Sequence, residues 1–176
     1  MGGILFVQTG GTIDKDYPRT TKGWAFEIGE EPAFVRTLAK LNPSFEYETV
    51  TAMRKDSLEI TDQDREELLN CIISHEKYDK IIITHGTDTM AETARYLATS
   101  TRSKPELACK TMVLTGSMRP ERFSNSDADV NLGMAISAVQ ILDPGSIVIC
   151  MHGLVIPYDQ VQRNVETGQF ERRIDE

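Results

Sequence analysis

The sequence predicts an α/β protein with an open, mostly parallel sheet flanked by helices, in a flavodoxin-like three-layer architecture. Short apolar runs alternate with longer amphipathic stretches from one end of the chain to the other, and this alternation is typical of parallel strands joined by helices. The 176 residues, 40% hydrophobic and 26% charged, have the length and composition of one globular domain. We therefore interpret residues 1–176 as a single domain.

Five short apolar runs are interpreted as the strands of this sheet. They cover residues 4–8, 47–53, 80–84, 111–115 and 146–151. Four segments between them carry apolar residues at helical spacing, over residues 31–41, 61–75, 87–100 and 127–142. The second of these begins with a capping signal, because Thr61 is followed three residues later by the carboxylate of Asp64.

Two stretches do not fit the alternation. Residues 14–29 include Pro18 and Gly23 and are too long for a routine strand-to-helix turn, so they form either a lid or binding loop or a surface hairpin. The polar segment after Pro157 is expected either to pair at a sheet edge or to mediate self-association.

Charge and composition exclude several classes of function. A net charge of −8 argues against a nucleic-acid partner, because binding phosphates requires a basic face. The apolar run at the N-terminus follows no basic leader and is too short for a membrane span, so we expect a cytoplasmic protein that does not bind membranes. Neither GxGxxG nor GxxxxGK[ST] occurs, which leaves no sequence signal for a dinucleotide or phosphate cofactor.

The three cysteines give no sign of a disulfide framework or a zinc site. Cys71, Cys109 and Cys150 are odd in number and show no CxxC spacing. We expect them to be reduced and mostly buried thiols.

Hydroxyl and small residues recur directly after the predicted strands, where ligands bind in parallel α/β sheets. They lie in Thr9-Gly10-Gly11-Thr12-Ile13, Lys55-Asp56-Ser57, His85-Gly86-Thr87-Asp88-Thr89 and Gly116-Ser117-Met118-Arg119-Pro120. Two threonine hydroxyls that approach one substrate, with backbone amides beside them, suit acyl transfer. Each segment also has a structural interpretation, since Thr12 and Thr87 are ordinary turn or helix-capping residues. His85 resembles a catalytic base, but the strand-end interpretation is favoured.

Taken together, these segments resemble the signatures of the bacterial-type L-asparaginase family. Residues 9–13 and 85–90 are similar to its two signature motifs, in the same order, and residues 113–120 with Ser126-Asp127 and Asn131-Leu132 resemble a third stretch. The resemblance covers the chain from about Ile4 to Phe170.

The resemblance implies hydrolysis of L-asparagine to L-aspartate and ammonia, without a metal or cofactor. Thr12 would be the nucleophile, Tyr17 its hydrogen-bonded partner and Thr87 the second catalytic hydroxyl. Asp88 would hold the substrate α-amino group and Ser57 its α-carboxylate, while the backbone of Gly11 and Ser117 would contact the amide. A lone domain leaves its cleft open to water, so we expect a neighbouring subunit to cover it in a homodimer or homotetramer.

Three departures from the family pattern bear on this hypothesis. The segment expected to supply a catalytic lysine offers Arg163, which would act electrostatically because an arginine stays charged. Ser57 is followed by Leu58, which removes one polar contact to the substrate. The family's smaller C-terminal domain has no counterpart, and we interpret the chain as a natural single-domain form. A related amidase or glutaminase, or a non-catalytic module that binds asparagine or aspartate, are the alternatives.

Overall fold

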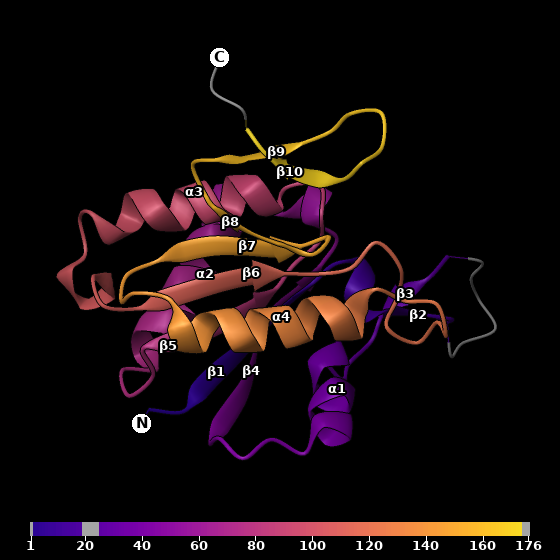
Figure 1. Cartoon of the computed structure of the whole chain (residues 1–176), viewed down its shortest axis with the longest axis horizontal. Coiled ribbons are helices and arrows are strands. Elements are labelled where there is room, and N and C mark those ends of the chain that lie inside the picture. Colours follow the sequence, from indigo (N-terminus) through magenta and orange to yellow (C-terminus); the bar gives the residue numbers. More distant parts are fainter. Residues whose placement is uncertain (1, 19–24, 174–176) are drawn as a thin grey trace.

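The computed structural model describes residues 2–18 and 25–173, and its centre is a six-stranded sheet (Figure 1). The strands run in the order β4-β1-β5-β6-β7-β8. The first five are parallel and β8 pairs antiparallel with β7. Their bounds are β1 Ile4–Gly10, β4 Tyr47–Lys55, β5 Lys80–Thr84, β6 Thr111–Thr115, β7 Ile147–Met151 and β8 Leu154–Pro157.

Helices cover both faces of the sheet, as Figure 1 shows. They are α1 Ala33–Leu41 and α4 Ala128–Ile141 on one face, and α2 Asp62–Ser74 and α3 Met90–Thr101 on the other. A hydrophobic core lies on each face of the sheet, and successive residues of β1 belong to opposite cores. Phe6 packs on the α1/α4 side and Leu5 on the α2/α3 side. Strands β1, β6 and β7 are buried along their whole length. Burial on both faces explains their continuous apolar runs.

The predicted architecture is confirmed, with one strand of the six-stranded sheet missed. All five predicted strands and four predicted helices are present, in the flavodoxin-like strand order. The missed strand is β8, which follows β7 after the two-residue turn His152-Gly153, where φ is 53° and 81°. Positive φ at both positions matches the tight turns that join antiparallel strands. Three further 3₁₀ turns span Thr12–Asp14, Ser57–Glu59 and Pro105–Leu107.

The two stretches outside the alternation each form a small hairpin. Strand β2 (Lys15–Asp16) pairs antiparallel with β3 (Glu27–Ile28), so the stem of the 14–29 stretch is a hairpin, whereas Gly23 lies outside the described residues. The segment after Pro157 forms β9 (Val161–Arg163) and β10 (Phe170–Arg172). This second hairpin pairs with itself rather than with the sheet, and its buried residues join the core on the α3 side.

The three cysteines are free thiols. Cys150 is buried, and burial raises its pKa to about 12. Cys109 is exposed, so the expectation of mostly buried thiols is wrong for this residue. No described helix has the length and the apolar character that crossing a bilayer requires.

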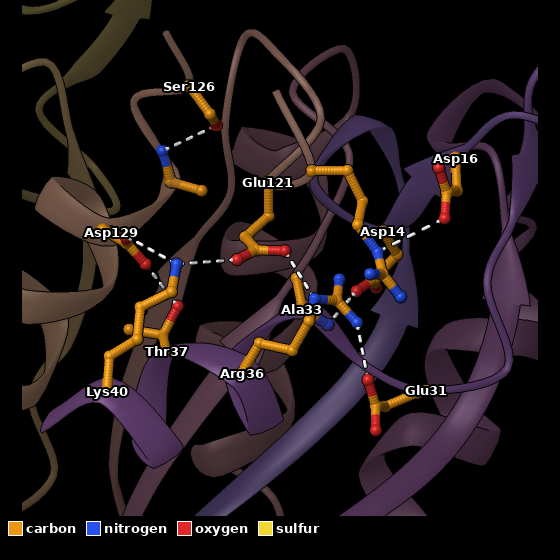
Figure 2. A network of polar contacts seen from close by, with 12 residues as sticks. Asp14, Asp16, Glu31, Ala33, Arg36, Thr37, Lys40, Glu121, Ser126 and Asp129 are labelled. Atoms are coloured by element: carbon orange, nitrogen blue, oxygen red, sulfur yellow. Dashed lines mark hydrogen bonds and ion pairs between the residues drawn. The ribbon is translucent and has the colours of Figure 1, made fainter. Parts of the chain in front are cut away.

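Helices α1 and α2 begin in different ways. Helix α2 has the predicted capping box, in which Thr61 Oγ1 accepts from Asp64 N and the Asp64 carboxylate accepts from Thr61 N at 2.9 Å. Helix α1 follows Pro32, which offers no side-chain cap, and the carboxylate of Asp14 takes that place from a distant part of the chain. Asp14 Oδ1 accepts from Ala33 N at 2.7 Å, within the polar network of Figure 2.

Burial raises the pKa of Asp14 from 3.8 to about 6, although the hydrogen bond from Ala33 N opposes the shift. Between these two pH values the folded chain binds more protons than the unfolded chain. This group therefore stabilises the fold as the pH falls through that window, and its ionised form destabilises the fold at neutral pH.

We expect Asp14→Asn to raise the free energy of unfolding at pH 7.5 by on the order of 2 kcal/mol, because it removes a buried charge and keeps the acceptor for Ala33 N. At pH 4 the variant and the unmodified chain should be equally stable. Urea denaturation at both pH values measures this difference. A matched Asp14→Ala variant should lose about 1 kcal/mol at pH 4 from loss of the cap. If the unmodified chain were more stable than Asp14→Asn at pH 7.5, the proposed raised pKa of Asp14 would be contradicted.

Candidate active site

The strand order places a ligand-binding crevice at the carboxyl ends of β1 and β5. Strand β1 is flanked by β4, which follows it in the sequence, and by β5, to which the chain crosses next. Connections therefore leave β1 and β5 toward opposite sides, and ligands bind at such switch points in open α/β sheets. The segments that follow these strands are the predicted Thr9–Ile13 and His85–Thr89 loops.

Glycines bring these loops into backbone contact. A Cβ placed on Gly11, whose φ is 85°, would lie 2.3 Å from both the Cα and the N of Gly86. A Cβ on Gly86 would lie 2.6 Å from the Oγ of Ser57, which is 1% exposed. Only residues without a side chain permit this approach. The ends of β1, β4 and β5 therefore meet at one point, and three of the four predicted site segments converge there.

Thr12 and Thr87 each lie one residue beyond this backbone contact. Thr12 is half-buried and Thr87 is 8% exposed. Within the described residues neither hydroxyl forms a hydrogen bond, whereas the hydroxyl of Thr9 donates to Thr84 O at 2.8 Å and that of Thr89 to Ser57 O at 2.7 Å. The two predicted catalytic hydroxyls are thus the ones left available to a ligand.

Asp88 and Arg163 form an ion pair at the start of α3. Arg163 Nη1 lies 2.5 Å from Asp88 Oδ1, and Arg163 Nε donates to Gly168 O at 3.1 Å. The side chains of Asp88 and Arg163 are 45% and 32% exposed. Arg163 comes from β9, so the second hairpin carries this positive charge to the site. Among the described residues Arg163 forms no hydrogen bond with Thr87.

The loop that contains Ser117 is held by the first turn of α4. Asp127 accepts from Met118 N at 3.0 Å and from Arg119 N at 3.2 Å, while Asn131 Nδ2 donates to Gly116 O at 3.0 Å. The Ser117 hydroxyl donates to Arg119 O within the same loop. The side chain is therefore engaged, which leaves the backbone as the part of Ser117 that can contact a ligand.

The side chain of Tyr17 forms no hydrogen bond with Thr12, and it lies in an exposed position. The residue is 71% exposed, and its ring packs on Phe26 with centroids 4.9 Å apart. Lys15, two residues earlier, pairs with Asp56 at 2.7 Å and so ties β2 to the Ser57 turn. Leu58, in the same turn, is 74% exposed. The contact between Tyr17 and Thr12 stays a prediction.

A buried chain of hydrogen bonds, which the sequence did not predict, fixes the loop after β5. His85 is fully buried, and burial lowers its pKa to about 4. His85 Nδ1 lies 2.8 Å from Gly86 O and must donate, so Nε2 accepts from the Thr93 hydroxyl at 2.9 Å. Arg65 Nε donates to the same hydroxyl at 3.1 Å. His85 is thus a neutral strand-end residue that orients Gly86.

No group of three or more His, Cys, Asp or Glu residues within 2–18 and 25–173 is arranged to hold a metal ion. The side chains described above offer hydroxyls, one carboxylate and one guanidinium at the ends of these strands.

The chain matches the family model described as asparaginase, N-terminal, over residues 3–170. An L-asparaginase of Thermococcus kodakarensis is 30% identical over 154 residues, which cover 87% of this chain and 45% of that protein. A glutaminase-asparaginase of Acinetobacter glutaminasificans is 30% identical over 139 residues, covering 76% of this chain and 40% of that protein.

Solved structures give the same likeness over almost the whole chain. The thermostable L-asparaginase from Thermococcus kodakarensis superposes with a TM-score of 0.76 at 26% identity, covering 97% of this chain and 51% of that one. This chain spans less than half the length of the curated relatives described above.

Proposed function

This chain belongs to the asparaginase family, and on that premise we propose that it hydrolyses the side-chain amide of L-asparagine with Thr12 as the nucleophile. The contact between Gly11 and Gly86 is the observation that carries the proposal, because it joins the backbones of the two loops in which Thr12 and Thr87 are the next residues, at the β1/β5 switch point. Neither threonine hydroxyl is bonded to another residue within 2–18 and 25–173, which supports the same proposal.

The proposed reaction has two steps. Thr12 Oγ attacks the amide carbon, the C–N bond breaks, and ammonia leaves with the proton that the hydroxyl gives up. Water then hydrolyses the ester to give aspartate and restore Thr12. Thr87 is proposed to exchange hydrogen bonds with the reacting groups, and the N-terminus of α3, three residues after Thr87, favours the negative charge that develops.

Asp88 and Ser57 are proposed to hold the amino-acid head group. Asp88 Oδ1 is engaged by Arg163, so Oδ2 is the oxygen that we expect to accept from the α-ammonium. Ser57 is proposed to donate to the α-carboxylate, and the backbones of Gly11 and Ser117 to contact the amide. Binding a substrate ammonium beside the Arg163 guanidinium places like charges close together, which lowers affinity and distinguishes this site from one with an isolated carboxylate.

A second candidate, a binding module for asparagine or aspartate, is favoured by one observation. The cation paired with Asp88 is an arginine, which cannot accept a proton at physiological pH. Ammonia release from L-asparagine, L-glutamine and D-asparagine, with calorimetry on L-aspartate, separates the candidates. The hydrolase requires release from L-asparagine above a heat-denatured control, and release only from L-glutamine would assign a glutaminase. Saturable binding of aspartate without ammonia would replace the hydrolase by the module.

Variants at Arg163 test whether its positive charge contributes to catalysis and whether a residue at this position can exchange a proton. We expect Arg163→Met to lower kcat/KM for L-asparagine about 10-fold, because Asp88 loses the contact that orients it. Thermal unfolding should change little, since the ion pair is half-exposed. Arg163→Lys keeps the charge and should retain most of the activity, while its pH profile gains an alkaline inflection as the lysine deprotonates. Identical pH profiles for the arginine and lysine forms would contradict a place for this side chain near the reacting groups.

A further inference from the structure

The β9–β10 hairpin, which carries Arg163 to the proposed active site, does not pair with the central sheet. It lies on the α3 side of the sheet (Figure 1), where Val161 and Phe170 are buried in the core. A Cβ built on Gly168, between the two strands, would lie 3.7 Å from Arg163 Nη2 and 3.8 Å from Met118 Cε. The hairpin therefore reaches the loop after β6, and the contacts that hold it help to fix where the Arg163 guanidinium lies.

Within the described part of the chain, three hydrogen bonds tie residues 161–172 to other elements, in addition to the ion pair with Asp88. Arg95 Nη2 donates to Val161 O at 3.2 Å, Arg172 Nη2 donates to Val155 O at 3.0 Å, and Phe170 N donates to His152 Nδ1 at 3.1 Å. The first two join guanidiniums, which stay charged, to carbonyl oxygens. The third has an imidazole as its acceptor, and imidazoles change their charge between pH 5 and 8.

His152 lies at the carboxyl end of β7 and accepts this hydrogen bond as a neutral imidazole. A backbone N–H can only donate, so Nδ1 is the unprotonated nitrogen and the proton is on Nε2. A second proton on the ring would place an N–H group against the N–H of Phe170 and abolish the bond. Phe170 is 2% exposed, so its N–H would lose a partner that a buried donor requires.

Phe170 connects His152 to Arg163. The ring centroids of His152 and Phe170 are 6.0 Å apart with an angle of 32° between the planes, and Arg163 Cζ lies 5.9 Å from the Phe170 centroid. Phe170 is also the residue opposite Arg163 in the pairing of β9 with β10. A shift of Phe170 away from His152 therefore moves Arg163 relative to Asp88.

The elements around His152 carry charged groups of both signs. They are Asp88 before α3, Arg119 in the loop after β6, Arg163 on β9, Glu166 in the hairpin loop, and Glu171 and Arg172 on β10. Glu171 accepts from Gln162 Nε2 at 3.0 Å, and Asp88 is paired with Arg163. No carboxylate within residues 2–18 and 25–173 forms an ion pair with His152. The bond from Phe170 N is thus the described hydrogen bond that protonation of His152 removes.

We propose that His152 is a positioning residue for the proposed active site. Its neutral imidazole holds Phe170 N, and through Phe170 it holds Arg163 against Asp88, whereas protonation of His152 releases this hold. The effect on catalysis rests on the proposed function, but the hold on the hairpin does not.

Amide hydrogen exchange of the full chain, measured by NMR, tests the hold without any substrate. His152→Gly removes the acceptor and suits the φ of 53° at this position, so the turn should remain. We expect the Phe170 amide to exchange about 5-fold faster or more in this variant at pH 8, because it loses its hydrogen bond. His152→Asn keeps a side-chain acceptor on a residue that tolerates positive φ, so it should restore the protection.

The pH dependence distinguishes a titrating contact from a merely structural one. Asparagine does not titrate, so the unmodified chain and His152→Asn should protect the Phe170 amide equally at pH 8, whereas the unmodified chain should protect it less at pH 5. The other titrating groups are the same in both proteins and cancel in this comparison. His75→Asn removes a histidine at the end of α2 and should keep the pH dependence of the unmodified chain.

Activity tests whether His152 acts through Arg163. On the proposed function, His152→Gly should lower kcat/KM for L-asparagine at pH 8 by about 5-fold, because the guanidinium is displaced from Asp88. Combining His152→Gly with Arg163→Met should lower activity little below Arg163→Met alone, since both changes remove the same contact. Losses that multiply in the double variant, or no loss in His152→Gly, would overturn the proposal.

The proposal also fails if His152→Gly protects the Phe170 amide as well as the unmodified chain does, or if His152→Asn shows the same pH dependence as the unmodified chain. Should the unmodified chain release no ammonia from L-asparagine, the proposed function fails, while the exchange data still decide whether His152 holds the hairpin. Should His152→Gly not fold, the pH comparison with His152→Asn decides instead.

Discussion

Thr12→Ala is expected to reduce ammonia release from L-asparagine by on the order of 10³-fold or more, because it removes the only atom proposed to form the bond to the substrate carbon. The fold should be unaffected, since the Thr12 hydroxyl makes no hydrogen bond to another described residue and the side chain is only half-buried. Steady-state assays and thermal unfolding on the same samples measure both effects.

Two variants control for this prediction. Thr12→Ser keeps a hydroxyl and should retain part of the activity, whereas Thr87→Val replaces the second hydroxyl by a methyl group of similar size and should lose on the order of 10²-fold. If both threonines act on one substrate, the double variant should fall little below Thr12→Ala. Full activity in Thr12→Ala and in Thr87→Val would contradict the proposed mechanism.

Gly11→Ala is expected to be severely damaging for a change of one methyl group. The new Cβ would lie 2.3 Å from backbone atoms of Gly86, and φ at this position is 85°, which L-residues rarely adopt. A backbone cannot rotate away as a flexible side chain can, so the two loops must separate. We expect a loss of at least about 2 kcal/mol in the free energy of unfolding. Activity should fall about 100-fold or more, since a displacement near 1 Å has that effect on catalytic groups.

Gly133→Ala provides the matched control. Gly133 lies on the exposed side of α4, and a Cβ there would meet no atom within 4 Å. The same substitution should stabilise the chain by about 0.5–1 kcal/mol, because alanine favours a helix, and should leave activity unchanged. Urea denaturation and ammonia release for both variants test the pair. If Gly11→Ala and Gly133→Ala had equal stability and activity, the contact between Gly11 and Gly86 would not be needed for the fold or for catalysis.

Strand and helix positions followed from hydrophobic pattern because the sheet is sandwiched between helices. Strands such as β1 and β6 are buried on both faces and therefore appear as continuous apolar runs. Strand β8 was not predicted, because it is only four residues long and its turn, His152-Gly153, is not one of the dipeptides that typically indicate a hairpin. The hairpins at 15–28 and 161–172 depend on contacts with other elements, which a local pattern does not encode.

The sequence predicted which segments form the candidate site, but not which side chains in it contact each other. The rule that ligands bind beyond the carboxyl ends of parallel strands identified the segments that carry Thr12, Ser57 and Thr87. The partner of Arg163 was not identified, because Asp88 lies 75 residues away in the sequence. Nor did the pattern show that His85 is bonded to Thr93, since burial of both side chains depends on how α3 lies on the sheet.

The sequence by itself determined the fold class, the order of the five parallel strands and four helices along the chain, and the family, because apolar periodicity and glycine-rich strand ends are local properties of the chain. Only the tertiary structure decided which charges and hydroxyls are engaged. Asp14 illustrates the difference, since its place beside Thr12 is visible in the sequence, whereas its burial and its contact with Ala33 N arise only when α1 docks on the sheet. Desolvation and hydrogen bonding depend on neighbours in space, and those neighbours set the chemistry of each group.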